Sequence, residues 1–243
     1  KQSCDTYFYE IARKLGVDRL KETSIKFGLG EKVLKKTFGN EKKGLIPDTK
    51  WKKDNLGKGW VIGETLITGI GQGYTQTTPL QLCQMTAQLA NGGFKIYPKI
   101  ILEEDNKSAE DIRVSMNENL KELDKNKKYD TKNEILGFLD RKKYEPLFKN
   151  SKNIRLVQEA MFASTNEIRG TSYKSRIDDP KYQFAGKTGT SQVRRITEAD
   201  RELDLKTFEI PYNERDHALY IAFGPYKNPR YALSIVIEHG GSG

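Results

Sequence analysis

Helical periodicity fills the first part of this chain of 243 residues, and strand-like alternation fills the last part. The clearest helix begins at Pro79, because Thr78 can cap it, proline suits the first helical position and Gln81 completes a capping box. Near the end, the segment 231–238 alternates apolar and other residues, as a strand with one buried face does. Helices first and strands last, joined by short connections, predict an α+β fold with an antiparallel sheet rather than a doubly wound parallel one.

Other segments complete this outline. The N-terminal segment predicts an amphipathic helix, with Ser3 or Asp5 as N-cap candidates and Gly16 at its end. A short second helix is expected from Asp18, and the remaining stretch to Trp60 has the composition of a loop. The apolar stripe of the first helix consists of Phe8, Ile11, Ala12 and Leu15.

A charged segment divides the chain. Residues 103–150 hold 12 acidic and 11 basic side chains, which is typical of an inserted, solvated region. We therefore expect a mainly helical part at 1–100, the insertion at 103–150, and a sheet part at 151–243. The expected elements around the insertion are a strand at 94–100, a helix from Ile154, and strands at 182–193 and 218–223.

Composition excludes several classes of protein. The chain has no apolar run of the length that a membrane span needs, and it begins without Met or a signal-peptide pattern, so we expect it to be a piece of a longer protein. The 42 basic and 33 acidic residues give a net charge of +9, but no aromatic-basic motif accompanies this excess. Nucleic-acid binding is therefore not expected.

Two patterns that suggest chemistry have a simpler interpretation. The glycines of 69–73 lack the preceding strand and the immediately following helix that a nucleotide fingerprint needs, so they indicate a tight structural loop. Asp216 and His217 are adjacent, and adjacent residues on a strand point to opposite faces, which argues against a Ser-His-Asp triad.

The sequence Lys-Thr-Gly-Thr at 187–190 is more informative. A strand of this composition can place an ammonium and a hydroxyl beside a glycine, whose missing side chain lets an extended substrate lie along the strand edge. Such a site suits a peptide carboxylate. Taken alone, however, Lys-Thr-Gly occurs by chance in roughly a few per cent of chains of this size.

Other motifs accompany it in a recognisable order. Ser-Cys-Asp at 3–5 reads as a Ser-x-Asn/Asp element, and the block 69–82, with Gly-Ile-Gly-Gln-Gly-Tyr and Thr-Pro-Leu-Gln-Leu, precedes the Lys-Thr-Gly strand. In this order the chain resembles the class B penicillin-binding proteins of the cell-elongation type, the penicillin-binding protein 2 group. The resemblance covers most of the chain apart from 103–150.

The resemblance implies a penicillin-binding-protein or serine β-lactamase-like fold, in which helices flank an antiparallel sheet beside an all-helical subdomain. It also implies roles for single residues. Ser3 would relay a proton towards the leaving group, Asp5 would help to order the substrate, and Lys187 would tune the electrostatics around Ser3. The substrate or β-lactam carboxylate would be bound by Thr188, Gly189 and Thr190, with the Thr190 backbone N–H in the oxyanion hole.

Two departures from the family pattern matter. No Ser in the 243 residues is followed three positions later by Lys, so the nucleophile and its base are expected upstream, and the chain alone is expected to be inactive. Cys4 is by default a small buried residue. In some elongation-type relatives a thiolate at this place joins upstream Asp and His ligands around a structural zinc, so the resemblance makes Cys4 a candidate metal ligand. Catalysis by the family mechanism requires no cofactor.

The resemblance implies a peptidoglycan D,D-transpeptidase that cross-links stem peptides by serine acyl transfer and is trapped by β-lactams. Its expected place is the periplasmic face of the bacterial inner membrane, held by an N-terminal anchor, beside a shape-determining glycosyltransferase. Two alternatives stay open: a serine β-lactamase or carboxypeptidase on the same fold, and a non-catalytic β-lactam-sensing domain.

Overall fold

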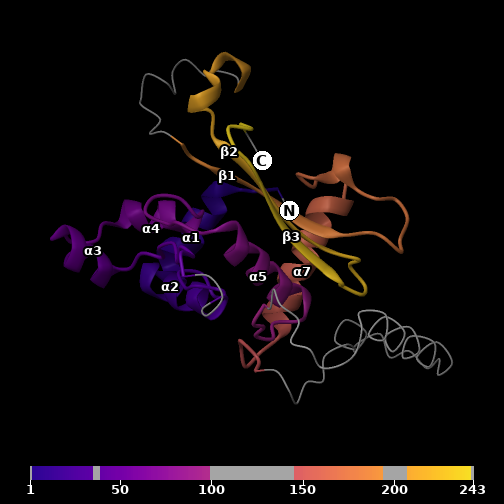
Figure 1. Ribbon diagram of the computed structural model, residues 1–243, viewed down its shortest axis with the longest axis horizontal. Helices are drawn as coiled ribbons and strands as arrows, with labels where there is room; N and C mark the ends of the chain where they lie inside the picture. The colour runs from indigo at the N-terminus through magenta and orange to yellow at the C-terminus, as the bar shows by residue number, and fades with distance from the viewer. Residues whose placement is uncertain (1, 35–38, 99–144, 194–206, 242–243) are drawn as a thin grey trace.

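The computed structural model of the chain describes residues 2–34, 39–98, 145–193 and 207–241 (Figure 1). The charged insertion expected at 103–150 lies outside these residues up to position 144. Within the described ranges, every helix is too short or too polar to cross a membrane.

The N-terminal part is helical, as expected, and its helices gather on one side of the sheet (Figure 1). The predictions of the first two helices and of the helix from Pro79 are confirmed. The helices of this part are α1 (Asp5–Leu15), α2 (Val17–Lys26), α3 (Thr49–Leu56), α4 (Ile62–Gly69) and α5 (Pro79–Ala90).

Helix α3 contradicts the expectation of loop between α2 and Trp60. Its ends are fixed locally, because the Asp48 carboxylate accepts a hydrogen bond from the Trp51 backbone N–H at 2.6 Å and Gly57 ends the helix with φ of 65°. The one buried side chain of α3 is Lys52. The helix therefore has no apolar stripe that periodicity could detect. Helix α4, which follows Trp60, was likewise not predicted.

Helix α1 differs from its prediction in two respects. Cys4, rather than Ser3 or Asp5, occupies the N-cap position, and it makes no side-chain capping bond. Of the predicted apolar stripe only Ala12 is buried, since 46% of Phe8 and 41% of Ile11 are exposed. Among the described residues, Ala12 is therefore the one residue of α1 that is buried, and it lies against Gly69 of α4.

Helix α5 forms the predicted capping box, and its buried side combines Leu89 with glutamines. The Gln81 side-chain amide donates hydrogen bonds to the carbonyl oxygens of Glu31 and Lys43, at 2.6 and 2.9 Å. The Gln88 amide likewise donates to the Phe27 carbonyl at 2.9 Å. These bonds attach the loop after α2 to α5.

The predicted antiparallel sheet has the order β1-β2-β3, and the helix expected from Ile154 is α7 (Lys152–Asn166). Helix α5 packs on β2 and β3, while α7 packs on β1. A buried cluster that includes Leu89, Met161, Ala185 and Phe223 joins these elements. The strands are β1 (Ala185–Ser191), β2 (His217–Gly224) and β3 (Tyr231–Ile237), and the short 3-10 helices are η2 (Tyr173–Ser175), η3 (Thr207–Glu209) and η4 (Tyr212–Glu214).

The strand expected at 94–100 is not formed in its described residues, 94–98. Phe94 makes a single antiparallel bridge with Pro146, and the segment is held instead by side chains of α5. The Gln84 amide donates to the Ile96 carbonyl at 2.9 Å, and the Ile96 N–H donates to Gln88 at 3.1 Å.

Candidate active site

Lys187 and Ser3 connect the sheet to the N-terminal helix. The Lys187 ammonium donates a hydrogen bond to the Ser3 hydroxyl at 2.7 Å, and further bonds to the Thr188 carbonyl at 2.7 Å and the Thr188 hydroxyl at 3.3 Å. An ammonium has three N–H donors, so each finds an acceptor here. The lysine therefore holds the Ser3 oxygen at a fixed position beside the start of β1.

The protonation of Lys187 is shaped by its surroundings. Burial lowers the pKa of the Lys187 ammonium from its ordinary value, while the negative charge of Asp5 opposes this shift. Asp5 lies in the first turn of α1. The structure thus brings together three of the residues that the resemblance singled out.

Ser3 lies immediately before the N-cap of α1 and has a φ of 48°. This left-handed conformation is uncommon for a residue with a side chain. Because Ser3 is directly followed by the helix, the position of its hydroxyl depends on where α1 begins.

The other predicted residues of β1 lie next to Lys187. Thr190 is exposed, while Thr188 and Gly189 are partly buried. A Cβ atom added at Gly189 would find Leu219 as its nearest neighbour, at the ordinary contact distance of 3.4 Å. The surrounding protein therefore does not require glycine at this position.

Gly186 is the opposite case, and it identifies a residue that the sequence reasoning missed. A Cβ atom at Gly186 would lie 2.2 Å from the Tyr220 hydroxyl, so the phenol fills the space above this glycine. The Tyr220 and Thr165 hydroxyls are 3.4 Å apart. Tyr220 on β2 pairs with Thr188 on β1. The sequence alone does not give this register, because it depends on how the two strands pair.

The geometry supports neither a Ser-His-Asp triad nor a nucleotide-binding loop. The Asp216 carboxylate accepts a hydrogen bond from the Val193 N–H at 3.1 Å, and His217 Nδ1 accepts one from the His239 N–H at 2.9 Å. Neither side chain is arranged as in a Ser-His-Asp triad. Gly69 is the last residue of α4, Gly71 and Gly73 follow in the turn after it, and α5 begins only at Pro79.

Cys4 is exposed, so the interpretation as a small buried residue is wrong. Its thiol lies 3.3 Å from the Thr6 hydroxyl, and this hydrogen bond lowers the pKa of the thiol. Among the described residues, no group of three or more His, Cys, Asp or Glu side chains could hold a metal ion. Structural zinc is normally held by four ligands, of which these residues would supply one at this place.

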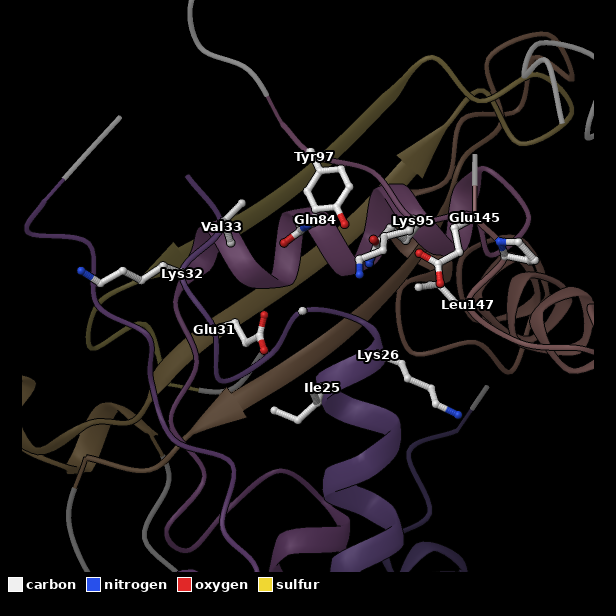
Figure 2. A pocket seen from close by; sticks show the side chains of 13 residues that line it. Ile25, Lys26, Glu31, Lys32, Val33, Gln84, Lys95, Tyr97, Glu145 and Leu147 are labelled. Carbon is white, nitrogen blue, oxygen red and sulfur yellow. The ribbon is translucent and has the colours of Figure 1, made fainter. Parts of the chain in front are cut away.

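A separate cavity of about 310 Å³ lies between the end of α2, α5 and the segments 95–97 and 145–147. Figure 2 shows the carboxylates of Glu31 and Glu145 and the side chain of Lys95 around it. The Tyr97 hydroxyl, followed by the charges of Glu145 and Glu31, raises the pKa of Lys95. None of the predicted site residues lines this cavity.

Comparison with known proteins agrees with the order of motifs. A model of the penicillin binding protein transpeptidase domain matches residues 1–243. The peptidoglycan D,D-transpeptidase MrdA of Salmonella typhimurium is 35% identical over 243 residues, which is 100% of this chain and 34% of the relative. MrdA of Escherichia coli is 30% identical over 247 residues, again covering 100% of this chain and 34% of the relative. The chain thus spans about a third of the length of these relatives.

Solved structures show the same fold. Pseudomonas aeruginosa PBP2, in complex with WCK 5153, is 33% identical with a TM-score of 0.68, and the match covers 98% of this chain and 43% of that one. Helicobacter pylori PBP2, in complex with MreC, is 28% identical with a TM-score of 0.70, over 98% of this chain and 35% of that one. The α+β fold predicted from the order of the elements and the penicillin-binding-protein fold implied by the resemblance are therefore confirmed, and the chain belongs to the penicillin-binding protein transpeptidase family.

Proposed function

We propose that this chain is the part of a peptidoglycan D,D-transpeptidase that moves the proton and binds the carboxylate of the donor peptide. The observation that carries the proposal is the 2.7 Å hydrogen bond between Lys187 on β1 and Ser3 before α1. It joins two polar groups that are 184 positions apart in the chain, at the sheet edge, where a peptide can lie. The MrdA relatives support the assignment by their names and by their coverage of the whole chain.

In the proposed reaction, the serine of a Ser-x-x-Lys element outside this chain attacks the carbonyl carbon between the last two residues of a D-alanyl-D-alanine stem peptide. A C–O bond forms, the C–N bond breaks, and terminal D-alanine leaves with the proton. The amine of a neighbouring stem peptide then attacks the ester, which forms the cross-link and returns a proton to the serine oxygen. A β-lactam would stop this sequence at the ester.

Ser3 and Lys187 are proposed to pass the proton to the leaving amine. The Ser3 hydroxyl accepts a hydrogen bond from the Lys187 ammonium, which leaves the hydroxyl's own proton free to point elsewhere. A positioned proton donor of this kind contributes about 10²–10⁴-fold to a rate. Asp5, whose charge acts on Lys187, is proposed to help order the substrate.

The carboxylate of the donor peptide is proposed to bind along Thr188, Gly189 and Thr190. Gly189 supports this proposal, because the surrounding protein would accept a Cβ at this position. An extended ligand that lies along the strand edge explains the glycine better than packing within the protein does. Thr190, being exposed, is accessible to such a ligand. The Thr190 backbone N–H is the proposed oxyanion donor.

The setting of the longer protein is also a proposal. We infer that it is anchored in the inner membrane, faces the periplasm and works with shape-determining proteins, including a glycosyltransferase. The complex of Helicobacter pylori PBP2 with MreC supports an assembly of this kind. If zinc binds at Cys4, its other ligands come from outside the described residues.

The test uses a protein extended upstream of residue 1 through a Ser-x-x-Lys element, here called the extended protein. It is incubated with a stem pentapeptide donor and an excess of an amine acceptor, and the products are separated by mass. The proposal predicts a cross-linked product with release of D-alanine. Release of D-alanine with hydrolysis alone would indicate a carboxypeptidase, and a folded protein that leaves the donor intact would indicate the sensing alternative.

A further inference from the structure

Helices α1 and α4 approach each other at Gly69 and Ala12. A Cβ atom added at Gly69 would lie 2.3 Å from the Ala12 Cβ, whereas its next neighbours, the Phe8 carbonyl oxygen and the Ala12 Cα, are at 3.4 and 3.7 Å. The obstruction would therefore come from a single methyl group. Both atoms sit directly on helix backbones and cannot rotate away, so only a separation of the two helices could relieve the collision.

Of the two helices, α4 is the more firmly held. Its Glu64 carboxylate accepts a 2.5 Å hydrogen bond from the buried Lys52 ammonium of α3, and the Trp60 indole N–H donates to the Thr65 hydroxyl at 2.8 Å. Each helix has one buried residue among the described residues, Ala12 in α1 and Thr65 in α4. The side-chain hydrogen bond between Arg13 and Glu10 stays within α1, however, whereas Glu64 ties α4 to the neighbouring helix α3. A side chain at position 69 would consequently displace α1 rather than α4.

The position of α1 matters because Ser3 immediately precedes it. The Ser3 hydroxyl is held at 2.7 Å from the Lys187 ammonium, which stands on the sheet and would not move with α1. A separation of the helices at Ala12 therefore changes the distance and angle between the two groups that the proposed reaction uses. Misplacement of a reacting group by about 1 Å can cost about 100-fold in rate.

We propose that Gly69 and Ala12 form a positioning pair, which sets the Ser3 hydroxyl against Lys187 through the closeness of α1 to α4. The proposal deepens the transpeptidase function and rests on it for its effect on rate. Neither residue of the pair belongs to the groups that are proposed above to contact the substrate. Gly69, the first glycine of the 69–73 block, thus has the role of letting α1 and α4 approach each other closely.

The test compares four forms of the extended protein. Gly69→Ala introduces the collision, and Ala12→Gly in the same chain removes the obstructing methyl group. Gly63→Ala is the matched control, because Gly63 lies on the same helix and a Cβ there would have no neighbour within 4 Å. Each form is first shown to be folded at the assay temperature by its midpoint of thermal unfolding.

The first readout is the second-order rate of acylation by a fluorescent penicillin. We expect Gly69→Ala to slow acylation by about 10- to 100-fold while the protein stays folded. Gly63→Ala should leave the rate unchanged. The double variant should recover most of the rate even though the glycine introduced into α1 lowers its thermal midpoint, because glycine weakens a helix. A purely structural role would make the rate follow the thermal midpoint instead.

The second readout does not depend on activity. A short reagent that joins a thiol to an amine is used to link Cys4, next to Ser3, to Lys187, and the product is mapped by peptide mass. The yield should fall in Gly69→Ala and return in the double variant. Unchanged yield and unchanged acylation in folded Gly69→Ala would overturn the positioning role, as would a loss that Ala12→Gly does not repair. If the unmodified protein is never acylated, the proposed function fails, and the cross-link yields still decide the positioning role.

Discussion

The ammonium of Lys187 lies 2.7 Å from the hydroxyl oxygen of Ser3, although the two residues are 184 positions apart in the chain. One stands on β1 of the sheet and the other precedes the first helix. The contact therefore forms only when the helical part and the sheet part are packed correctly against each other. Two predictions follow from it directly.

Replacing Ser3 by Ala removes the acceptor of this hydrogen bond and the proposed proton relay. Acylation of the extended protein by penicillin should slow by about 100-fold or more, as expected for the loss of a general acid–base group. Ser151→Ala is the control, since Ser151 is exposed and makes no capping bond to α7. Equal acylation rates for the two variants would contradict the role of Ser3.

The pH dependence of acylation should depend on the charge of Lys187. Burial lowers the pKa of this ammonium, so the proposed donor is lost as the pH rises through a value below that of a free lysine. The acylation rate should therefore fall on the alkaline side. In Lys187→Arg the guanidinium stays protonated, so the alkaline fall should disappear even if the different shape of the group lowers the overall rate. If the acylation rate of the arginine variant still falls at alkaline pH, a group other than Lys187 causes the fall, and the prediction is wrong.

The same pKa shift predicts a direction for stability. Because the folded-state pKa of Lys187 is below that of the unfolded chain, the unfolded state binds more protons between the two values. The contribution of Lys187 to stability should therefore become more favourable as the pH rises through this window. A comparison of thermal midpoints of the extended protein with those of Lys187→Arg across the window measures this contribution.

The two cysteines should differ in reactivity towards an alkylating reagent. Cys4 is exposed and the Thr6 hydroxyl lowers its pKa, whereas burial raises the pKa of Cys83. The thiolate is the reactive form, so Cys4 should be alkylated first and Thr6→Val should slow it. Peptide mapping after brief exposure to iodoacetamide distinguishes the two sites. Faster modification of Cys83 would contradict the arrangement of both residues.

Gln81 should be important for stability. Its buried amide donates to the carbonyls of Glu31 and Lys43, and Gln81→Leu would leave both without this donor. The expected cost is about 1–3 kcal/mol, because two hydrogen bonds of a buried side chain are lost at about 0.5–1.5 kcal/mol each. Gln76→Leu is a control of the same chemical kind on an exposed side chain. Chemical unfolding of the extended protein should show a lower midpoint for Gln81→Leu alone.

The sequence was most informative where local chemistry decides the structure. The start of α5 could be predicted from Thr78, Pro79 and Gln81, because all parts of the cap lie within four positions. Strand β3 could be predicted from its alternation, and the predicted ends of the three strands differ by a few residues from those observed. The same alternation at 94–100 was misleading, since only an isolated bridge forms there among the described residues. Helix α3 could not, since its buried side chain is a lysine whose partner, Glu64, lies 12 positions away.

The site was predictable only in part from the residues themselves. The Lys-Thr-Gly sequence suggested a carboxylate-binding strand, but its connection to Ser3 came from the resemblance, because no spacing rule links positions that are 184 apart. The roles of Tyr220 beside Gly186, and of Ala12 beside Gly69, depend on strand register and helix crossing. Such contacts exist only once the chain is folded.

The most direct test of the account is the intact mass of two proteins after incubation with a penicillin. One is the chain of 243 residues, and the other is the extended protein with its Ser-x-x-Lys element. The account predicts an increase by the mass of one penicillin on the extended protein and no increase on the chain alone. A covalent adduct on the chain alone would contradict the assignment of the nucleophile, and a folded extended protein without an adduct would contradict the transpeptidase function.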